Sequence, residues 1–156
     1  MLSKTMMMFA LMGLILAGSV QADESWTEDL AAAKEAAKKG SKIIVADFTG
    51  SDWCGFCKKQ HAEVFDTDAF KAWAKENAVL LTVDFPSKKQ LSDETKKQNA
   101  TLKEKFAIRG FPTVIFMNEK GEELGRFVGY RPGSGADAWL GKAKDIVAGK
   151  TEKAGQ

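Results

Sequence analysis

Two cysteines separated by two residues stand where a predicted buried strand gives way to a predicted helix, in the run WCGFCK at 53–58. The apolar, β-rich run IIVADF at 43–48 indicates the strand, and residues 54–65 indicate the helix. A cysteine at a helix N-terminus faces unpaired backbone amides and the positive end of the helix dipole, and both favour the reactive thiolate. This placement predicts a redox-active pair, in which Cys54 attacks a disulfide and Cys57 resolves the mixed disulfide.

A Cys-x-x-Cys pair has two other uses in proteins. Half of a zinc site would need two more ligands, and only His61 and an acid such as Glu63 lie nearby, in a chain with no other cysteine. A purely structural disulfide across so short a loop would constrain few residues and stabilise the fold little. Redox chemistry is therefore the favoured interpretation, with no metal and no cofactor expected.

Residues 1–22 differ in composition from the rest of the chain. Their only charge is Lys4, and an unbroken apolar run of 12 residues extends from Met6 to Ala17. A positive start, a short apolar centre and small residues at the end are typical of a secretory signal peptide, so we expect cleavage after Ala22 and a periplasmic or secreted protein. The alternative is an uncleaved anchor, but the run is shorter than the roughly 20 apolar residues that span a bilayer.

The remaining sequence predicts a single α/β domain at 23–149 and a flexible tail at 150–156. Two buried strands joined by helices make a right-handed parallel crossover, and the turn NEKG predicts a hairpin between the last two strands. The capping-box sequence SWTE at 25–28 predicts the start of the first helix. Asp66 is predicted to cap a later helix. The expected strands lie at 43–48, 79–83, 114–117 and 123–128, and the expected helices at 25–40, 54–65, from 66 onward and at 137–148.

A polar, lysine-rich stretch at 86–105 separates the second and third predicted strands. A structureless loop of that length is uncommon inside a compact domain, so its spaced apolar positions predict one or two amphipathic helical turns. Its lysines are interpreted as a solvated face. Over the whole chain 23 Lys and Arg are interspersed with 21 Asp and Glu, which argues against a nucleic-acid or membrane-surface binder.

The run RGFPT at 109–113 immediately precedes the third predicted strand. Proline cannot donate a hydrogen bond to a sheet, so Pro112 belongs at the start of a strand or on an edge. Bonds that precede proline are those at which cis peptides occur. We expect a cis Phe111–Pro112 bond that leaves the backbone of Phe111 free to pair with an extended substrate.

Taken together, WCGFCK after a buried strand, GFPT before a later strand and VGY after the hairpin resemble the thioredoxin superfamily over roughly residues 43–148. The run FTGSDWCGFCKK is most similar to exported thioredoxin-like proteins of the "thioredoxin-7" type. The resemblance implies a thioredoxin-like α/β fold, with a central four-stranded mixed sheet flanked by helices and a helical insertion before the cis-proline strand. It also implies that Cys54 is the nucleophile, Cys57 the resolving cysteine and Pro112 the cis-proline that faces them.

The resemblance further implies a substrate-binding groove around the cysteine pair. Trp53, Phe111, Pro112 and Gly129 are expected to line it, and Phe56 adds a second exposed aromatic ring at the helix start. The dipeptide between the cysteines is Gly-Phe, where thioredoxin has a proline, and this departure leaves the reducing strength open. The other aromatic side chains predicted for the core are Phe48, Phe65, Phe70, Trp73, Phe106 and Phe116.

Two polar side chains near the motif are candidates for proton transfer. Thioredoxin carries a buried aspartate six residues before its first cysteine, whereas here Asp47 stands seven before Cys54, with an extra residue at 49–51. If that loop absorbs the extra residue, Asp47 points under the site and accepts the proton of Cys57; otherwise Asp52 or water takes this role. His61, the only histidine, is interpreted as a helix residue without a chemical role in preference to a proton relay.

The sequence thus predicts an exported protein thiol-disulfide oxidoreductase, either a reductase or an isomerase, that works through a Cys54–Cys57 redox disulfide. Its expected partners are proteins that contain disulfides or thiols, with a membrane thiol transporter as electron donor, and we expect a monomer. The alternative is a non-catalytic thioredoxin-like module that binds another protein and keeps its cysteine pair permanently oxidised.

Overall fold

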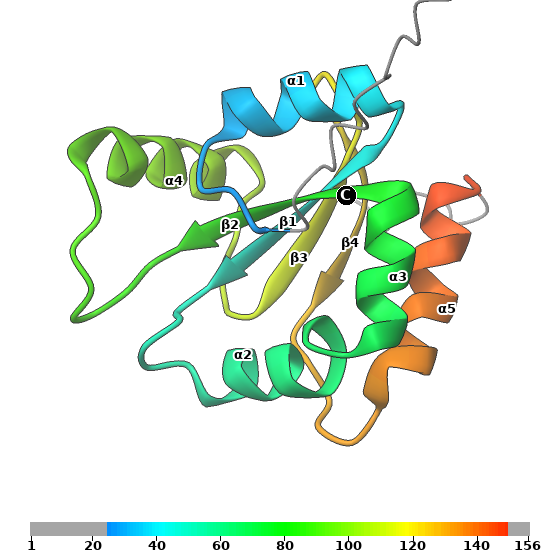
Figure 1. Cartoon of the computed structure of the whole chain (residues 1–156). Coiled ribbons are helices and arrows are strands. Elements are labelled where there is room, and N and C mark those ends of the chain that lie inside the picture. Colours follow the sequence, from blue (N-terminus) through cyan, green and yellow to red (C-terminus); the bar gives the residue numbers. More distant parts are fainter. Residues whose placement is uncertain (1–24, 150–156) are drawn as a thin grey trace, which may run out of the picture.

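A four-stranded mixed sheet with strand order β2-β1-β3-β4 lies between two layers of helices in the computed structural model, which describes residues 25–149 (Figure 1). The strands are β1 (Ile43–Thr49), β2 (Ala78–Asp84), β3 (Thr113–Met117) and β4 (Glu123–Val128). β1 runs parallel to β2 and antiparallel to β3, and β3 pairs antiparallel with β4. The mixed sheet and the hairpin predicted from the sequence are confirmed. The predicted signal peptide and flexible tail lie outside the described residues.

The alternation of side chains along β1 divides the core into two layers. Ile44, Ala46 and Phe48 pack with helices α1 (Leu30–Gly40) and α4 (Asp93–Lys105) on one face. Val45 packs on the other face, against α3 (Asp68–Asn77) and α5 (Gly135–Val147). Figure 1 shows these two helix pairs on opposite sides of the sheet. Asp47 is two residues after Val45, and therefore projects from the same face as Val45.

The aromatic side chains predicted for the core are buried. On the α3 and α5 face, Phe65, Phe70, Trp73 and Trp139 form a cluster with ring centroids 4.8–6.1 Å apart and mostly tilted or edge-to-face planes. Such geometry suits the ring quadrupoles, and burial of each ring removes a large apolar area from water. At the end of the last helix, Ile146 is buried and Val147 is exposed.

The first helix begins later than the sequence predicted. Helix α1 starts at Leu30, and its N-cap is Asp29, whose carboxylate accepts hydrogen bonds from the amides of residues 31 and 32. The predicted capping box at 25–28 is wrong because Thr27 is extended and pairs with β2: its amide donates to the Leu80 carbonyl (2.9 Å), and its carbonyl accepts from the Thr82 amide (2.8 Å). Trp26 is consequently not a helical residue.

The helix that follows the cysteines has two parts. Helix α2 (Gly55–Gln60) continues directly into the π-helical segment η1 (His61–Phe65). Together the two elements match the single helix predicted at 54–65. The next helix, α3, is capped by the side chain of Thr67 instead of the predicted Asp66, because the Thr67 hydroxyl accepts from the Phe70 amide (3.3 Å).

The lysine-rich stretch forms one helix of 13 residues, α4, which is longer than the one or two turns predicted. Ser92 caps it, and Asn99 and Leu102 are buried against the rest of the domain. The Asn99 side chain donates to the carbonyl of Asp84, at the end of β2 (2.9 Å). Helix α4 is therefore part of the layer that covers the sheet.

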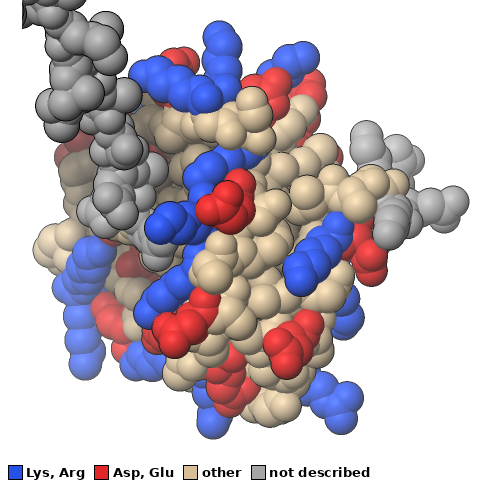
Figure 2. All heavy atoms as spheres, turned by 45° about the vertical axis from the view of Figure 1, so that its right-hand side comes forward, with Lys and Arg blue, Asp and Glu red and all other residues tan. Residues whose placement is uncertain are grey.

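The charged side chains are spread over the surface. On the face over α3 and α5, basic and acidic residues alternate without an extended area of one sign (Figure 2). No helix within residues 25–149 is both long enough and apolar enough to cross a lipid bilayer.

Candidate redox site

Cys54 and Cys57 form a disulfide at the start of α2, with their Cα atoms 5.3 Å apart. Cys54 is the N-cap of the helix, and its sulfur accepts a hydrogen bond from the Cys57 amide (3.2 Å). Cys54 is 6% exposed and Cys57 is 1% exposed, so Cys54 is the more accessible of the two, although both residues are largely covered. In the reduced protein the same amide would stabilise a Cys54 thiolate, which is the nucleophilic form of cysteine.

The loop between β1 and α2 absorbs the extra residue in a tight turn. The Gly50 carbonyl accepts hydrogen bonds from the amides of Trp53 (3.1 Å) and Cys54 (2.7 Å). The buried Asp84 carboxylate fixes the turn from β2, because it accepts from both the amide and the hydroxyl of Ser51. These contacts place the first cysteine at the helix start regardless of the longer spacing from β1.

Asp52, one of the alternative proton acceptors, has a different task. Its carboxylate accepts hydrogen bonds from the amides of Ser87 (2.9 Å), Lys88 (2.6 Å) and Lys89 (3.1 Å). These bonds, that of Ser87 above all, lower the pKa of Asp52. Asp52 therefore connects the active-site loop to the segment after β2, and an acidic group so stabilised as a carboxylate is a weak base for a thiol.

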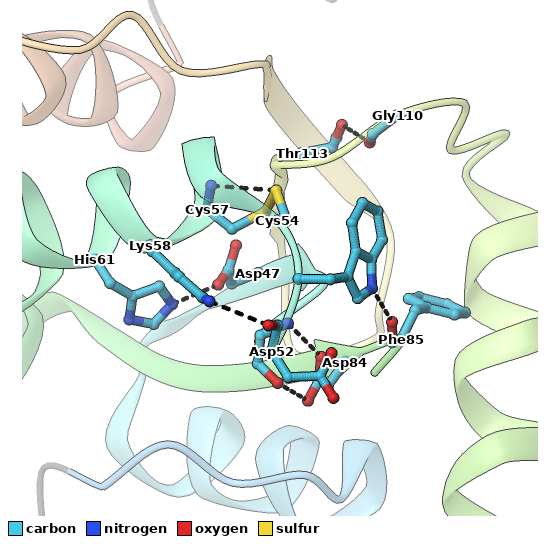
Figure 3. The surroundings of a disulfide bond; sticks show 12 residues. Asp47, Asp52, Cys54, Cys57, Lys58, His61, Asp84, Phe85, Gly110 and Thr113 are labelled. Carbon is cyan, nitrogen blue, oxygen red and sulfur yellow. Dashed lines mark hydrogen bonds and ion pairs between the residues drawn. A yellow bond between two sulfur atoms is a disulfide. The ribbon is translucent and has the colours of Figure 1, made fainter. Parts of the chain in front are cut away.

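Asp47 lies below the disulfide, in the middle of β1, and is 1% exposed (Figure 3). Its Oδ2 atom is 2.9 Å from Nε2 of His61, and its buried Oδ1 atom has no hydrogen-bond partner among the described residues. Burial raises the pKa of Asp47, and the hydrogen bond and charge of His61 offset part of that rise. The structure thus meets the condition set for Asp47, since the loop absorbs the extra residue and the carboxyl group lies on the α2 face.

His61, for which the sequence favours a helix position without a chemical role over a proton relay, contacts the buried carboxyl group. Its imidazole forms an ion pair with Asp47, and 34% of its side chain stays exposed. Trp26 and Phe65 flank the ring, with centroids 5.7 and 4.9 Å away. Burial lowers the pKa of His61, but the hydrogen bond and charge of Asp47 raise it by more, so the net shift is upward.

Two exposed aromatic rings lie beside the disulfide. Trp53 is 51% exposed and Phe56 is 57% exposed, as predicted for a binding surface. The Trp53 indole packs edge-on against Phe111 (centroids 5.9 Å apart) and donates from Nε1 to the carbonyl of Phe85 (2.8 Å). The indole also lies over Gly50, where an added Cβ would be only 2.3 Å from the ring.

The predicted cis Phe111–Pro112 bond is present. Gly110 and Thr113, which flank it, are among the residues that surround the disulfide in Figure 3. The Pro112 carbonyl accepts from the amide of Gly129 (2.8 Å), so these two predicted groove residues are neighbours, although Pro112 itself is buried. Within the described chain, no hydrogen bond involves the backbone of Phe111.

The zinc interpretation gains no support from the geometry. Residues 25–149 contain no group of three or more His, Cys, Asp and Glu side chains arranged to hold a metal ion. His61, the nearest candidate ligand in the sequence, directs Nε2 at Asp47. The arrangement at the start of α2 is instead suited to thiol–disulfide exchange: a sulfur at a helix N-terminus, a second cysteine beside it, and a buried aspartate paired with a partly exposed histidine below both.

Comparison with known proteins gives a consistent result. A family model described as a thioredoxin-like domain matches residues 30–144. The chain is 37% identical to the disulfide bond reductase DsbH of Chlamydia pneumoniae over an alignment of 120 residues. This alignment covers 77% of this chain and 71% of DsbH. It is 28% identical to the thioredoxin-related protein DsbJ of the same organism over an alignment of 109 residues. This alignment covers 70% of this chain and 30% of DsbJ. A solved structure of a DsbH oxidoreductase superimposes with a TM-score of 0.73 at 34% identity, over 80% of this chain and 84% of that one.

Proposed function

Because this chain belongs to the thioredoxin-like domain family and is a thiol-disulfide oxidoreductase, we propose that it reduces disulfide bonds of exported proteins through Cys54 and Cys57. The observation that carries the direction of the reaction is the 37% identity with a protein described as a disulfide bond reductase. The narrower resemblance to the "thioredoxin-7" type stays a prediction.

The proposed reaction proceeds in two exchanges. The Cys54 thiolate of the reduced protein attacks one sulfur of a substrate disulfide, so that a mixed disulfide forms and the other substrate sulfur leaves as a thiolate. Cys57 then loses its proton and attacks the Cys54 sulfur, which forms the Cys54–Cys57 disulfide and releases the second substrate thiolate. Two electrons pass to the substrate, both of its thiolates take up protons, and the cysteine pair is oxidised.

The second exchange needs a base for Cys57, and we assign that role to Asp47. Cys57 is only 1% exposed, so water has little access to its thiol. Asp47 lies beneath the cysteines, with a raised pKa that brings its basicity closer to that of a thiol, and its Oδ1 atom is unpartnered among the described residues. A base whose pKa lies nearer to the working pH is the more effective catalyst.

Substrate is proposed to bind as an extended segment beside the disulfide. Trp53, Phe56 and Phe111 supply apolar surface, and the Phe111 backbone, which has no hydrogen-bond partner in the described chain, can pair with the segment as a strand would. Pro112 and Gly129, joined by their hydrogen bond, form the floor beside it.

The proposed location follows from the signal-peptide-like sequence at residues 1–22, which predicts export to the periplasm or the cell exterior. A reductase in an oxidising compartment must receive electrons from outside it. We assign this supply to a membrane thiol transporter, and we propose that the protein works as a monomer on substrates that contain disulfides.

The reduction potential of the Cys54–Cys57 pair separates the possible directions. Equilibration of the protein with dithiol buffers, followed by alkylation and mass measurement, is expected to give a value near the roughly −270 mV of thioredoxin. A value near about −180 mV would indicate an isomerase, and one near about −120 mV an oxidase.

The matched controls are Cys54→Ser and Cys57→Ser, neither of which can form the pair. A wild-type protein that stays oxidised in excess dithiothreitol and leaves a peptide disulfide intact would favour the non-catalytic binding module instead.

A further inference from the structure

The ion pair between Asp47 and His61 joins the buried site to the protein surface. Asp47 is 1% exposed, whereas 34% of the His61 side chain is exposed. Figure 3 shows one Asp47 oxygen directed at the His61 ring and the other toward the disulfide. The first is the Oδ2 atom, 2.9 Å from Nε2, and the second is the unpartnered Oδ1 atom. The two oxygens of one carboxylate therefore face the cysteines and a surface histidine, respectively.

This arrangement answers a need that the proposed reaction creates. Each resolution step transfers one proton from the Cys57 thiol to Asp47, and if Asp47 is to be ionised again before the cysteine pair is next reduced, that proton has to leave the buried site. The Asp47 side chain has almost no contact with solvent, so it cannot release the proton directly. Within the described chain, His61 is the only side chain that forms a hydrogen bond or ion pair with Asp47.

We propose that His61 is a positioning residue that orients the Asp47 carboxylate beneath Cys57 and passes to solvent the proton that Asp47 takes from Cys57. This inference rests on the proposed reductase function. During resolution the Cys57 proton moves to Oδ1, the Cys57–Cys54 bond forms and the substrate thiolate leaves. The Asp47–His61 pair, which now holds one additional proton, releases a proton from the exposed imidazole and returns to its starting state.

The described side chains around the Asp47–His61 pair offer no other group that could carry the proton to solvent. The other charged groups that act on it are acidic: Asp84 at the end of β2 acts on both members, and Asp66 after η1 acts on His61. On the remaining sides the ring meets the aromatic side chains of Trp26 and Phe65. Of the two lysines of α2, Lys58 donates from its Nζ atom to the carbonyl of Asp52 (3.1 Å), and Lys59 is exposed, with its charge acting on Glu63.

The sign of the effect follows from these contacts. The hydrogen bond and charge of His61 lower the pKa of Asp47 against the rise caused by burial. Without His61, the carboxyl group holds its proton up to higher pH, and a protonated carboxyl group cannot act as a base. Removal of the imidazole should therefore slow the resolution step at neutral pH and move its pH dependence upward, while the attack by Cys54 is spared.

The test compares wild type with His61→Asn, which keeps an N–H donor but cannot carry a proton to solvent. The control is Lys59→Asn, which introduces the same residue at an exposed position of α2, the helix that continues into η1. Reduced protein is mixed with a peptide disulfide, quenched in acid at intervals and weighed, which gives the rates of formation and decay of the mixed disulfide at each pH. General-base contributions of 10²–10⁴-fold leave room for a loss of about tenfold in the decay rate near neutral pH. Formation is expected to change less than about twofold.

A second measurement leaves His61 in place and therefore does not depend on the folding of His61→Asn. His61 is the only histidine, so its ring resonances are unambiguous in NMR spectra of the wild-type protein. The midpoint of its titration is expected to differ between the oxidised and reduced forms, and to fall in Asp47→Asn, where the negative charge is removed.

The outcomes separate the inference from the function beneath it. If the wild-type protein forms no mixed disulfide, both are overturned. If it reduces the peptide normally but His61→Asn follows the pH profiles of wild type and Lys59→Asn, only the role of His61 is overturned. The same holds if the His61 titration is identical in the oxidised, reduced and Asp47→Asn proteins.

Discussion

Asp47→Asn is expected to make the protein more stable above neutral pH, while it slows the resolution step. The wild-type side chain is 1% exposed, and its Oδ1 atom has no partner among the described residues. The free energy of unfolding therefore includes a desolvation penalty whenever the carboxyl group is ionised. Asparagine has nearly the same shape and carries no charge. Asp47→Asn removes the cost of ionising this buried group, which is on the order of 1–2 kcal/mol, so the variant should be more stable than wild type by about that amount near pH 8.

The pH dependence supplies the sharper test. The folded-state pKa of Asp47 is raised by burial, so the folded protein holds a proton that the unfolded chain has already released. The contribution of Asp47 to the stability of the wild type is then fully present below the unfolded pKa of aspartate and is lost as pH rises through the folded value. The raised pKa of His61 acts in the same direction, since its contribution is present at low pH and is lost as pH rises. Asp47→Asn removes the effect of the raised Asp47 pKa and weakens the effect of the raised His61 pKa. The stability that the variant gains over wild type near pH 8 should therefore shrink or reverse near pH 5.

Urea unfolding of the oxidised proteins, followed by circular dichroism at about pH 5 and about pH 8, measures both quantities. The control is Asp145→Asn on the exposed side of α5, where a surface change should stay within about 0.5 kcal/mol at both pH values. A difference between wild type and Asp47→Asn that is the same at both pH values, or a variant clearly less stable near pH 8, would refute the account of a buried, desolvated carboxylate.

Three further predictions concern the supports of the site. Gly50→Ala places a Cβ 2.3 Å from the Trp53 ring, so the indole must move; we expect a shifted tryptophan emission and a raised KM for a peptide disulfide, with circular dichroism unchanged. Asp52→Ala removes three hydrogen bonds to the amides of residues 87–89, which should then exchange with deuterium faster, while amides in the centre of β1 keep their wild-type rates. Phe70→Ala empties a fully buried position in the aromatic cluster and is expected to lower the free energy of unfolding by about 3–5 kcal/mol, as judged by urea unfolding; a loss under about 1 kcal/mol would contradict the packing.

Much of the fold could be predicted from local patterns in the sequence. Strands β1 and β2 are short apolar runs, and the hairpin of β3 and β4 is marked by its turn, so each was found within a residue or two. The sequence also predicts Phe70 and Trp73, two of the three buried residues of α3, as core residues. In these elements a single periodicity determines both the type of structure and the buried side.

The clearest error occurred where a distant segment decides the structure. Ser25-Trp26-Thr27-Glu28 satisfies the local pattern of a helix start, but the backbone of Thr27 pairs with β2, more than 50 residues away in the sequence. An extended, sheet-paired residue cannot also begin a helix, so the cap moves to Asp29. The local sequence at 25–28 does not show that Thr27 pairs with β2, so it cannot indicate that the helix starts later.

The site was predicted in the same uneven manner. The cysteine pair and the cis-proline follow from motifs, whereas the partnership of Asp47 and His61 depends on how the loop at 49–53 turns. The two hydrogen bonds to the Gly50 carbonyl absorb the extra residue and leave the strand register intact. A histidine four residues after Cys57, on the helix face above a strand with a buried acid, is the signal that would have identified the pair.

The central claim, that Cys54 attacks and Cys57 resolves, is tested most directly by trapping the mixed disulfide. Reduced Cys57→Ala and Cys54→Ala proteins are each mixed with a peptide disulfide and weighed by intact-mass spectrometry after an acid quench. Cys54 is the helix N-cap and the more exposed of the two, so Cys57→Ala should accumulate a stable peptide adduct on Cys54, and Cys54→Ala should form almost none. Adducts that form at equal rates on the two proteins, or the absence of an adduct on Cys57→Ala, would contradict the account.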